Sequence, residues 1–404
     1  MTGVELATAA GLGREQARQH VGAATAAALQ LGRGLDLTEA NLAGCDLSGC
    51  DLRGAVFNRA ILHGTRFDGA NLEGATLICP GAERTSFRNA NLRGVYIHAL
   101  AAQVCNFDGA NLDDTLDATG SLFHGCSFLN TSLRGARLSG AAFYQCDLTK
   151  ASFARAALQG ATINECVLDE AEFFCADVSQ LTITKCHLSD TSFVNASGMG
   201  LVIQRPTAAD GLAFDGASLP ALRLLNVAGP DVSARGAQLE NGQIVECQLR
   251  GAELQHLAGR ALCIRDSDLT GADLGGAYLY RAFISGDPPT AMSLVSANLT
   301  GANLVQAYVA ADLTEAVLRR VNAAYARLNQ SVLRGADLSG AALYEASMVK
   351  TDCTDAKLGG VAPPFFADRC AGLMEALLAV GAADAMEAVR RLKAVTSIGK
   401  GGST

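Results

Sequence analysis

The sequence has no tryptophan, and phenylalanine and tyrosine together supply 5% of its 404 residues. Mean hydropathy is nevertheless positive at +0.20, so a large core must be built from small and aliphatic side chains. No apolar run approaches the ~18 residues of a membrane span. The first residues, MTGVELATAAGLGREQ, lack the basic and apolar regions of a signal peptide. We therefore expect a cytoplasmic protein with no membrane partner.

Positive charge is also in short supply, since 32 Lys and Arg stand against 40 Asp and Glu and give a net charge of −8. Proteins that read nucleic acid usually carry a basic patch, so we expect no direct nucleic-acid binding. The 13 cysteines are an odd number, which favours free thiols in a reducing compartment. A disulfide framework is the alternative.

Five of the cysteines are almost evenly spaced, which raises the question of a metal or redox site. Cys126, Cys146, Cys166 and Cys186 follow one another at intervals of 20 residues, and Cys105 lies 21 residues before Cys126. Whether this spacing reflects chemistry or a structural repeat depends on the rest of the sequence.

Large apolar side chains recur at every fifth residue. The frame has no exception from Leu37 to Leu77, and it continues with changes of phase to Leu358. Of the 15 phenylalanines, 11 lie on it. Because a period of five fits neither an α-helix nor an alternating strand, the chain is best interpreted as an array of short repeats.

The repeated unit is a small residue, then Asp, Asn or Ser, then Leu or Phe. Ala-Asn-Leu, for example, occurs at 40–42, 70–72, 90–92 and 110–112. Over residues 35–360 this pattern resembles the pentapeptide-repeat family. The resemblance implies an all-β solenoid, a right-handed quadrilateral β-helix with four pentapeptides in a coil of about 20 residues. It also implies that the central Leu or Phe and the small residue two places earlier point inward.

We expect five segments along the chain. An N-terminal helical cap at 1–34 precedes a first β-helix block at 35–195, an irregular break at 196–238, a second block at 239–360 and a C-terminal segment at 361–404. The break is expected because Gly and Pro interrupt the frame there. Short α-helical caps would cover the open edges at the two ends of the solenoid.

Both ends allow a second interpretation. The N-terminal stretch ELATAAGLGREQARQHV faintly resembles a helix-turn-helix, although a cap fits it better. The C-terminal segment is either a second cap or a homodimer contact, because several members of the family that it resembles dimerise through this end. The apolar residues that would make either contact are Phe365, Phe366, Leu373, Leu377 and Leu378.

No catalytic motif accompanies the repeat. Eight cysteines, among them Cys146 and Cys166, occupy the inward small position, where a thiol behaves as a small hydrophobic group. A straight ladder at the ~4.8 Å strand spacing does not converge on one metal ion. The six histidines form no metal-binding pair, and no nucleophile elbow, Walker loop or dinucleotide fingerprint occurs. We expect no cofactor, no metal site and no enzymatic activity.

Carboxylates are a better guide to function than cysteines. Residues 35–360 hold 34 Asp and Glu against 24 Lys and Arg, and many of the Asp occupy the outward slot before the central residue. One interpretation is solubility and hydrogen bonding between coils, and the other is a negatively charged rod that imitates duplex DNA. The candidate partner-binding carboxylates are Asp147, Asp169, Glu170 and Glu172.

The sequence thus predicts a non-enzymatic scaffold that binds a protein partner. The alternative comes from the resemblance, since several pentapeptide-repeat proteins imitate DNA, bind type II topoisomerases and protect gyrase from antibiotics. The net negative charge of residues 35–360 is far below the two charges per base pair of duplex DNA. The scaffold is therefore the preferred hypothesis, with a type II topoisomerase as the alternative partner.

Overall fold

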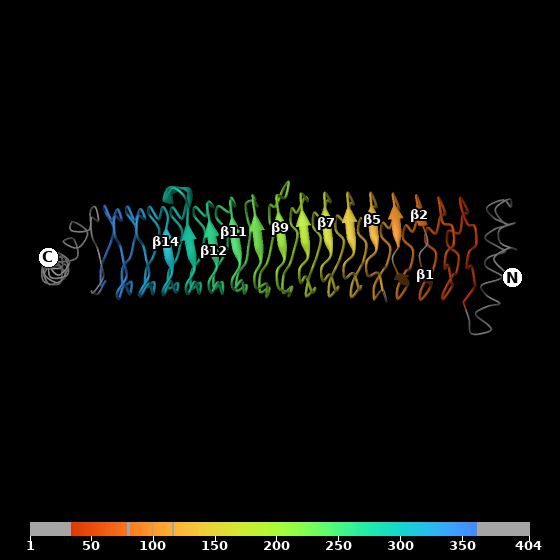
Figure 1. Ribbon diagram of the computed structural model, residues 1–404, viewed down its shortest axis with the longest axis horizontal. Helices are drawn as coiled ribbons and strands as arrows, with labels where there is room; N and C mark the ends of the chain where they lie inside the picture. The colour runs from red at the N-terminus through yellow and green to blue at the C-terminus, as the bar shows by residue number, and fades with distance from the viewer. Residues whose placement is uncertain (1–33, 79–80, 99, 115–116, 362–404) are drawn as a thin grey trace, which may run out of the picture. The chain divides into compact units, whose positions relative to one another are not determined.

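The computed structural model describes residues 34–78, 81–98, 100–114 and 117–361. Within these ranges all regular structure is short parallel strand and β-turn, together with one 3₁₀ turn. The predicted helical caps, including the apolar residues from Phe365 to Leu378, lie outside the described residues. The chain forms two compact units, which are described separately (Figure 1).

Unit 1 ends at Leu201 and also contains Pro206–Ala208. Its strands are three residues long, and they are β1 (Thr76–Ile78), β2 (Gly81–Glu83), β3 (Tyr96–His98), β4 (Ala101–Gln103), β5 (Leu122–His124), β6 (Ala142–Tyr144), β7 (Thr162–Asn164) and β8 (Thr182–Thr184). Strands β1 and β3 form one parallel pair. Strands β2, β4, β5, β6, β7 and β8 form a parallel sheet in that order.

Four ladders of parallel pairing run through unit 1. At its start the paired residues are Asp36 with Val56, Asn41 with Ile61, Asp46 with Arg66, and Asp51 with Asn71. The two residues of each pair are 20 positions apart in the sequence, and each ladder begins one pentapeptide after the one before it. One coil therefore consists of four pentapeptides, and each pentapeptide forms one of its four sides. The all-β parallel solenoid expected from the sequence is confirmed, and its handedness stays a prediction.

Unit 2 holds Val202–Arg205 and the chain from Ala209 onward. Its strands pair in sequence order and are β9 (Val202–Gln204), β10 (Arg223–Leu225), β11 (Gln243–Val245), β12 (Cys263–Arg265), β13 (Phe283–Ser285) and β14 (Tyr308–Ala310). The coil from Phe283 to its partner Tyr308 is longer by one pentapeptide than the coil from Cys263 to Phe283. The extra length follows β13 and includes the 3₁₀ turn η2 (Pro289–Ala291), drawn above the strands in Figure 1.

The segment 196–238, expected to be irregular, contains both a change of spacing and regular coils. In unit 1, His187 pairs with Ala208, one position beyond the partner that the regular interval would give. In unit 2, Ala213 pairs with Ser233 and Ser218 with Gln238, both at the regular interval. The division into five segments stays a prediction.

A β-turn ends each side of the coil. In one example the amide of Ala55 donates to the carbonyl oxygen of Leu52 at 3.1 Å. The third residue of that turn, Gly54, has φ +64°, a left-handed conformation that glycine adopts without steric cost. Residues other than glycine also adopt it, as Glu39 does at φ 62°, so the turn does not require glycine at every corner.

The core follows the five-residue frame. The side chains of all 11 phenylalanines on the frame are buried, whereas Phe174 and Phe283, which lie off it, are each 42% exposed. Phe173 stacks on Phe153 and on Phe193 with ring centroids 4.8 and 4.5 Å apart. Aromatic pairs at this separation add to the stabilisation from burial. Position relative to the frame therefore decides whether an aromatic side chain belongs to the core or to the surface.

Candidate partner-binding surfaces

The evenly spaced cysteines line one inner wall of unit 1. The amide of Cys146 donates to Cys166 Sγ at 3.3 Å, and Cys166 Sγ lies 3.5 Å from the carbonyl oxygen of Phe143 in the preceding coil. Among the described residues, no group of three His, Cys, Asp or Glu could hold a metal ion. In unit 2, burial raises the pKa of the Cys247 thiol to about 11. The Cys247 thiol is therefore a protonated core group.

Threonine in the same inward slot makes the same contact. Thr131 Oγ1 donates to the carbonyl oxygen of Phe107 at 2.7 Å, and Thr191 Oγ1 to that of Leu168 at 2.9 Å. Each acceptor is the central residue of a side in the preceding coil. The slot accepts Ala, Cys, Ser or Thr because it has room for a small side chain and offers one carbonyl oxygen to a donor.

The four candidate carboxylates lie on two sides of unit 1. Asp147 accepts hydrogen bonds from the amide and hydroxyl of Thr149 at 3.0 and 2.6 Å. Asp169 Oδ1 is 2.6 Å from His187 Nδ1, and Glu170 is 3.4 Å from Lys150 Nζ. On the next side, Glu172 pairs with residues 152 and 192 through its backbone. Three of the four thus have local partners, and their role in binding stays a prediction.

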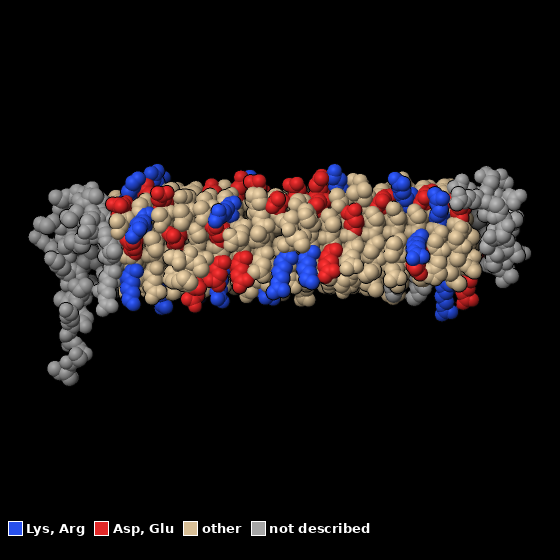
Figure 2. All heavy atoms as spheres, turned by 90° about the horizontal axis from the view of Figure 1, so that it is seen from above, with Lys and Arg blue, Asp and Glu red and all other residues tan. Residues whose placement is uncertain are grey.

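Three outward aspartates of unit 2 pair with an arginine of the preceding coil. In unit 2, Arg Nε lies 2.6 Å from Asp Oδ2 in the pair Arg319–Asp337, and the same contact is 2.5 Å in Arg250–Asp268 and 3.0 Å in Arg334–Asp352. Figure 2 shows the result, with basic and acidic side chains intermixed over the visible face of each unit. The net negative charge is therefore not concentrated in a continuous acidic surface on the face shown.

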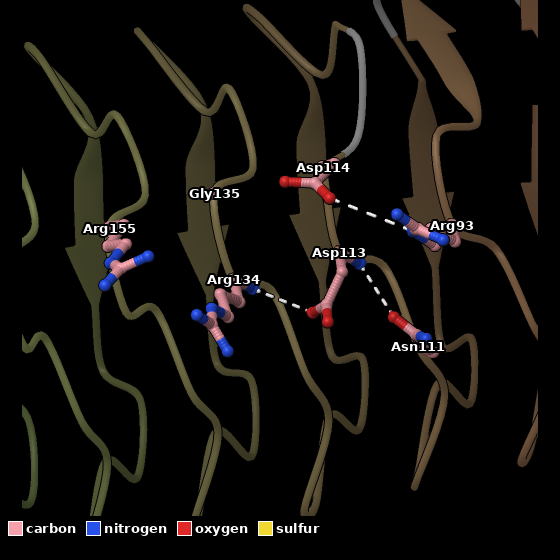
Figure 3. A pocket seen from close by; sticks show the side chains of 7 residues that line it. All are labelled: Arg93, Asn111, Asp113, Asp114, Arg134, Gly135 and Arg155. Atoms are coloured by element: carbon pink, nitrogen blue, oxygen red, sulfur yellow. Dashed lines mark hydrogen bonds and ion pairs between the residues drawn. The ribbon is translucent and has the colours of Figure 1, made fainter.

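A polar hollow of about 550 Å³ opens on unit 1 (Figure 3). It is lined by Arg93, Asn111, Asp113, Asp114, Arg134, Gly135 and Arg155. A Cβ at Gly135, where φ is +66°, would lie 2.7 Å from Asp114 Oδ1, so the absence of a side chain keeps this part of the hollow open.

The charges around the hollow are partly neutralised. Arg93 Nε lies 3.8 Å from Asp114 Oδ2, and Asp113 Oδ1 accepts the amide of Arg134 at 3.1 Å. Figure 3 shows the guanidinium groups of Arg134 and Arg155 apart from both carboxylates. The hollow could accept one carboxylate or phosphate group, although Asp113 and Asp114 would oppose it.

Unit 2 carries a group of aromatic side chains around one corner of four successive coils. We call this group, together with Arg281, the aromatic corner. Its aromatic members are the exposed Tyr278, Phe283, Tyr325 and Tyr344 and the half-buried Tyr280 and Tyr308. Phe283 and Tyr308 are in-register neighbours on β13 and β14, and their rings stack with centroids 5.0 Å apart. Tyr325 and Tyr344 meet edge to face at 5.4 Å.

Hydrogen bonds hold part of the aromatic corner in place. Tyr280 Oη donates to Gln306 Oε1 at 3.0 Å, and Arg281 Nε donates to the same oxygen at 2.7 Å. The Arg281 guanidinium also lies 5.0 Å from the centre of the Tyr280 ring, a cation–π contact. Tyr278 remains 44% exposed beside them. Such a surface is ordered before any partner binds.

Sequence reasoning missed the aromatic corner, although a signal was present. Of the 7 tyrosines, 5 fall between residues 278 and 344, and none of these occupies a central position of the frame. Side chains outside the central and the inward small positions of the repeat point outward, so the cluster could have been predicted from the frame alone. Counting aromatics over the whole chain hid their concentration in one place.

No helix among the described residues is long and apolar enough to cross a membrane.

Comparison with known proteins agrees with the observed fold. Two family models, both described as pentapeptide repeats, match residues 36–74, 151–190 and 311–361 in one case and 105–152 in the other. No curated protein matches the chain.

Two solved structures are similar to this chain. HetL, involved in heterocyst differentiation regulation in the cyanobacterium Nostoc sp., is 24% identical over 61% of this chain and 90% of its own, with a TM-score of 0.21. QnrB1, a plasmid-mediated fluoroquinolone resistance protein, is 18% identical over 70% of this chain and 93% of its own, also with a TM-score of 0.21. Together with the five-residue frame and the four parallel ladders, the family matches identify the chain as a pentapeptide-repeat protein.

Proposed function

We propose that this protein is a non-enzymatic scaffold that binds a protein partner through the outer faces of its coils. The observation that carries the proposal is the aromatic corner of unit 2. Tyr and Arg are among the residues most enriched at interface hot spots, and here they lie together on an exposed, preorganised surface. In a chain with so few aromatic residues, this concentration favours a recognition surface.

The groups that could do chemistry are largely occupied in holding coils together. Buried thiols contact carbonyl oxygens, and outward aspartates bind arginines or turn amides. A nucleophile needs an adjacent base, and a metal site needs converging ligands. The described residues therefore favour binding over catalysis.

Imitation of DNA for a type II topoisomerase is the second candidate. Its support is the excess of 34 Asp and Glu over 24 Lys and Arg in residues 35–360. The arginines paired with Asp268, Asp337 and Asp352 weaken it, because they neutralise carboxylates that would have to imitate phosphates. A supercoiling assay of gyrase inhibited by a fluoroquinolone, with micromolar amounts of this protein added, tests the imitation of DNA. If the protein neither protects gyrase from the drug nor inhibits the enzyme, this second candidate is excluded.

The scaffold proposal is tested by cross-linking inside the source cell. A photoreactive side chain would be placed at outward positions on both units of the full chain, and the cross-linked proteins would be identified by mass spectrometry. One protein captured repeatedly, and bound again by the purified chain, is the expected result. The proposal fails if the purified chain binds none of the captured proteins.

A further inference from the structure

We propose that the aromatic corner binds an extended acidic segment of a protein partner. The inference rests on the proposed scaffold function and adds the place and the chemistry of contact.

Three exposed arginines surround the aromatic corner without a carboxylate partner. Arg260 lies one coil before Tyr280, Arg281 covers the Tyr280 ring, and Arg327 pairs through its backbone with residue 308. No carboxylate of the described residues lies within ion-pair distance of these three guanidinium groups. This differs from the arginines at 250, 319 and 334, each of which binds an aspartate of the next coil.

The local charge is opposite in sign to that of the repeat region as a whole. The three arginines carry three positive charges. Glu345 beside Tyr344, and Glu240 one coil before Arg260, remove two of them, which leaves a positive net charge. Carboxylates of a partner would be attracted to this surface and could bind each guanidinium through two parallel hydrogen bonds.

The geometry suits an extended chain. Arg260 and Arg327 lie three coils apart, which is roughly 14 Å at the ~4.8 Å spacing of parallel strands. An extended peptide covers that length with about four residues. Side chains of an extended segment alternate between two faces, so acidic and apolar residues in alternation would reach the arginines and the exposed rings of Tyr278 and Phe283.

A nucleic acid fits this surface less well than an acidic peptide. Tyr280 is held by Gln306, so it is not free to turn its ring toward a base. A long polyanion would also extend beyond the three arginines over a repeat region with ten more acidic than basic residues. A short acidic segment avoids most of that repulsion.

The test begins with a photoreactive p-benzoylphenylalanine in place of Tyr278 in the full chain, expressed in the source cell. The matched position is Tyr144 in unit 1, a tyrosine at an outward position of a coil. We expect the probe at residue 278 to capture a protein segment rich in Asp and Glu. Capture of a neutral or basic segment, of a second copy of this chain, or of nucleic acid would overturn the inference.

Binding of the captured segment is then measured with a synthetic, fluorescein-labelled peptide and the purified chain. Phe283→Ala should weaken binding about tenfold, as truncation of an interface hot spot does. Arg281→Gln and Arg327→Gln should each weaken it several-fold and reduce its dependence on salt. Arg137→Gln in unit 1, an exposed arginine outside the aromatic corner, should have no effect. Equal affinity of all four variants would contradict the inference.

The outcomes separate the inference from the scaffold proposal. If a protein that the purified chain binds is captured at residue 144 and none at residue 278, the scaffold function stands and the aromatic corner is not its site. If no protein captured at any outward position binds the purified chain, both fail.

Discussion

Arg319 Nε lies 2.6 Å from Asp337 Oδ2, so an arginine that follows the central leucine of one coil binds the aspartate that precedes the central leucine of the next. The same interval along the chain separates Arg250 from Asp268 and Arg334 from Asp352, which make the same contact. An aspartate in the outward slot therefore has a structural role between coils, which limits its availability to a partner.

The first prediction concerns Asp337, which is 7% exposed. Burial alone would raise the pKa of Asp337, but hydrogen bonds from the hydroxyl and amide of Ser339 and from Arg319 outweigh it and lower this pKa to about 2. Since the ordinary value is 3.8, the carboxylate should stabilise the folded state by about 2 kcal/mol at pH 7. Asp337→Asn should lose about that much, measured by urea unfolding with tyrosine fluorescence.

The pH dependence of this loss provides the control. Because the pKa is lower in the folded state, the stabilisation is fully present above about pH 4 and is lost as the pH falls toward 2. Wild type and Asp337→Asn should therefore converge in stability between pH 4 and pH 2. Asp355→Asn, which changes an exposed carboxylate in the same unit, should stay close to wild type throughout. A constant difference at all pH values would contradict the prediction.

A second prediction concerns the reactivity of two cysteines. Cys175 is exposed, whereas Cys247 is buried and burial raises its pKa to about 11. The thiolate is the reacting form, so iodoacetamide at pH 8 should modify Cys175 and leave Cys247 intact until urea is added. Peptide mapping by mass spectrometry gives the extent of modification at each site. Modification of Cys247 at the rate of Cys175 in the native protein would show that the inner wall is open to solvent.

The inward slot gives a third prediction. Thr191→Val keeps the shape of the side chain but removes the donor to the carbonyl oxygen of Leu168, and it should cost about 1 kcal/mol. Thr182→Val, on the outer surface of β8, should be neutral or slightly stabilising because β-branched apolar residues favour strands. Urea midpoints of both variants measure the difference. If Thr191→Val matches Thr182→Val, the hydroxyl contact contributes nothing to stability.

The sequence was sufficient to predict the core of this fold. The five-residue frame identified the buried side chains, including the phenylalanines at 153, 173 and 193, and the length of a full coil explained the spacing of the cysteines. Repeats of Ala-Asn-Leu at the length of one coil are also in register, since Asn71 pairs with Asn91 and Asn91 with Asn111. This worked because the side chains that fill the core are set by local position within a strictly repeated unit.

Contacts between coils were harder to predict. Arg319, the partner of Asp337, occupies a different position of the repeat and lies slightly less than one coil earlier in the chain. Comparing residues at the same repeat position in successive coils therefore does not pair these two side chains. Asp169 was selected as an outward carboxylate, yet His187 of the next coil lies 2.6 Å from it. Diagonal pairs depend on how neighbouring coils align, and a one-dimensional count of charges contains no such information.

The last prediction compares two adjacent phenylalanines that the frame assigns to opposite sides of the coil wall. Phe173 is 0% exposed and stacked between two other rings, whereas Phe174 is 42% exposed. Phe173→Ala should lose about 3–5 kcal/mol because it leaves a cavity in a close-packed column. Phe174→Ala should change stability by about 0.5 kcal/mol or less, as surface substitutions generally do. Phe173→Leu should fall between them, since it refills part of the cavity. Urea midpoints of the three variants test this ranking, and equal losses from the two alanine substitutions would mean that the five-residue frame does not set the energetics of this solenoid.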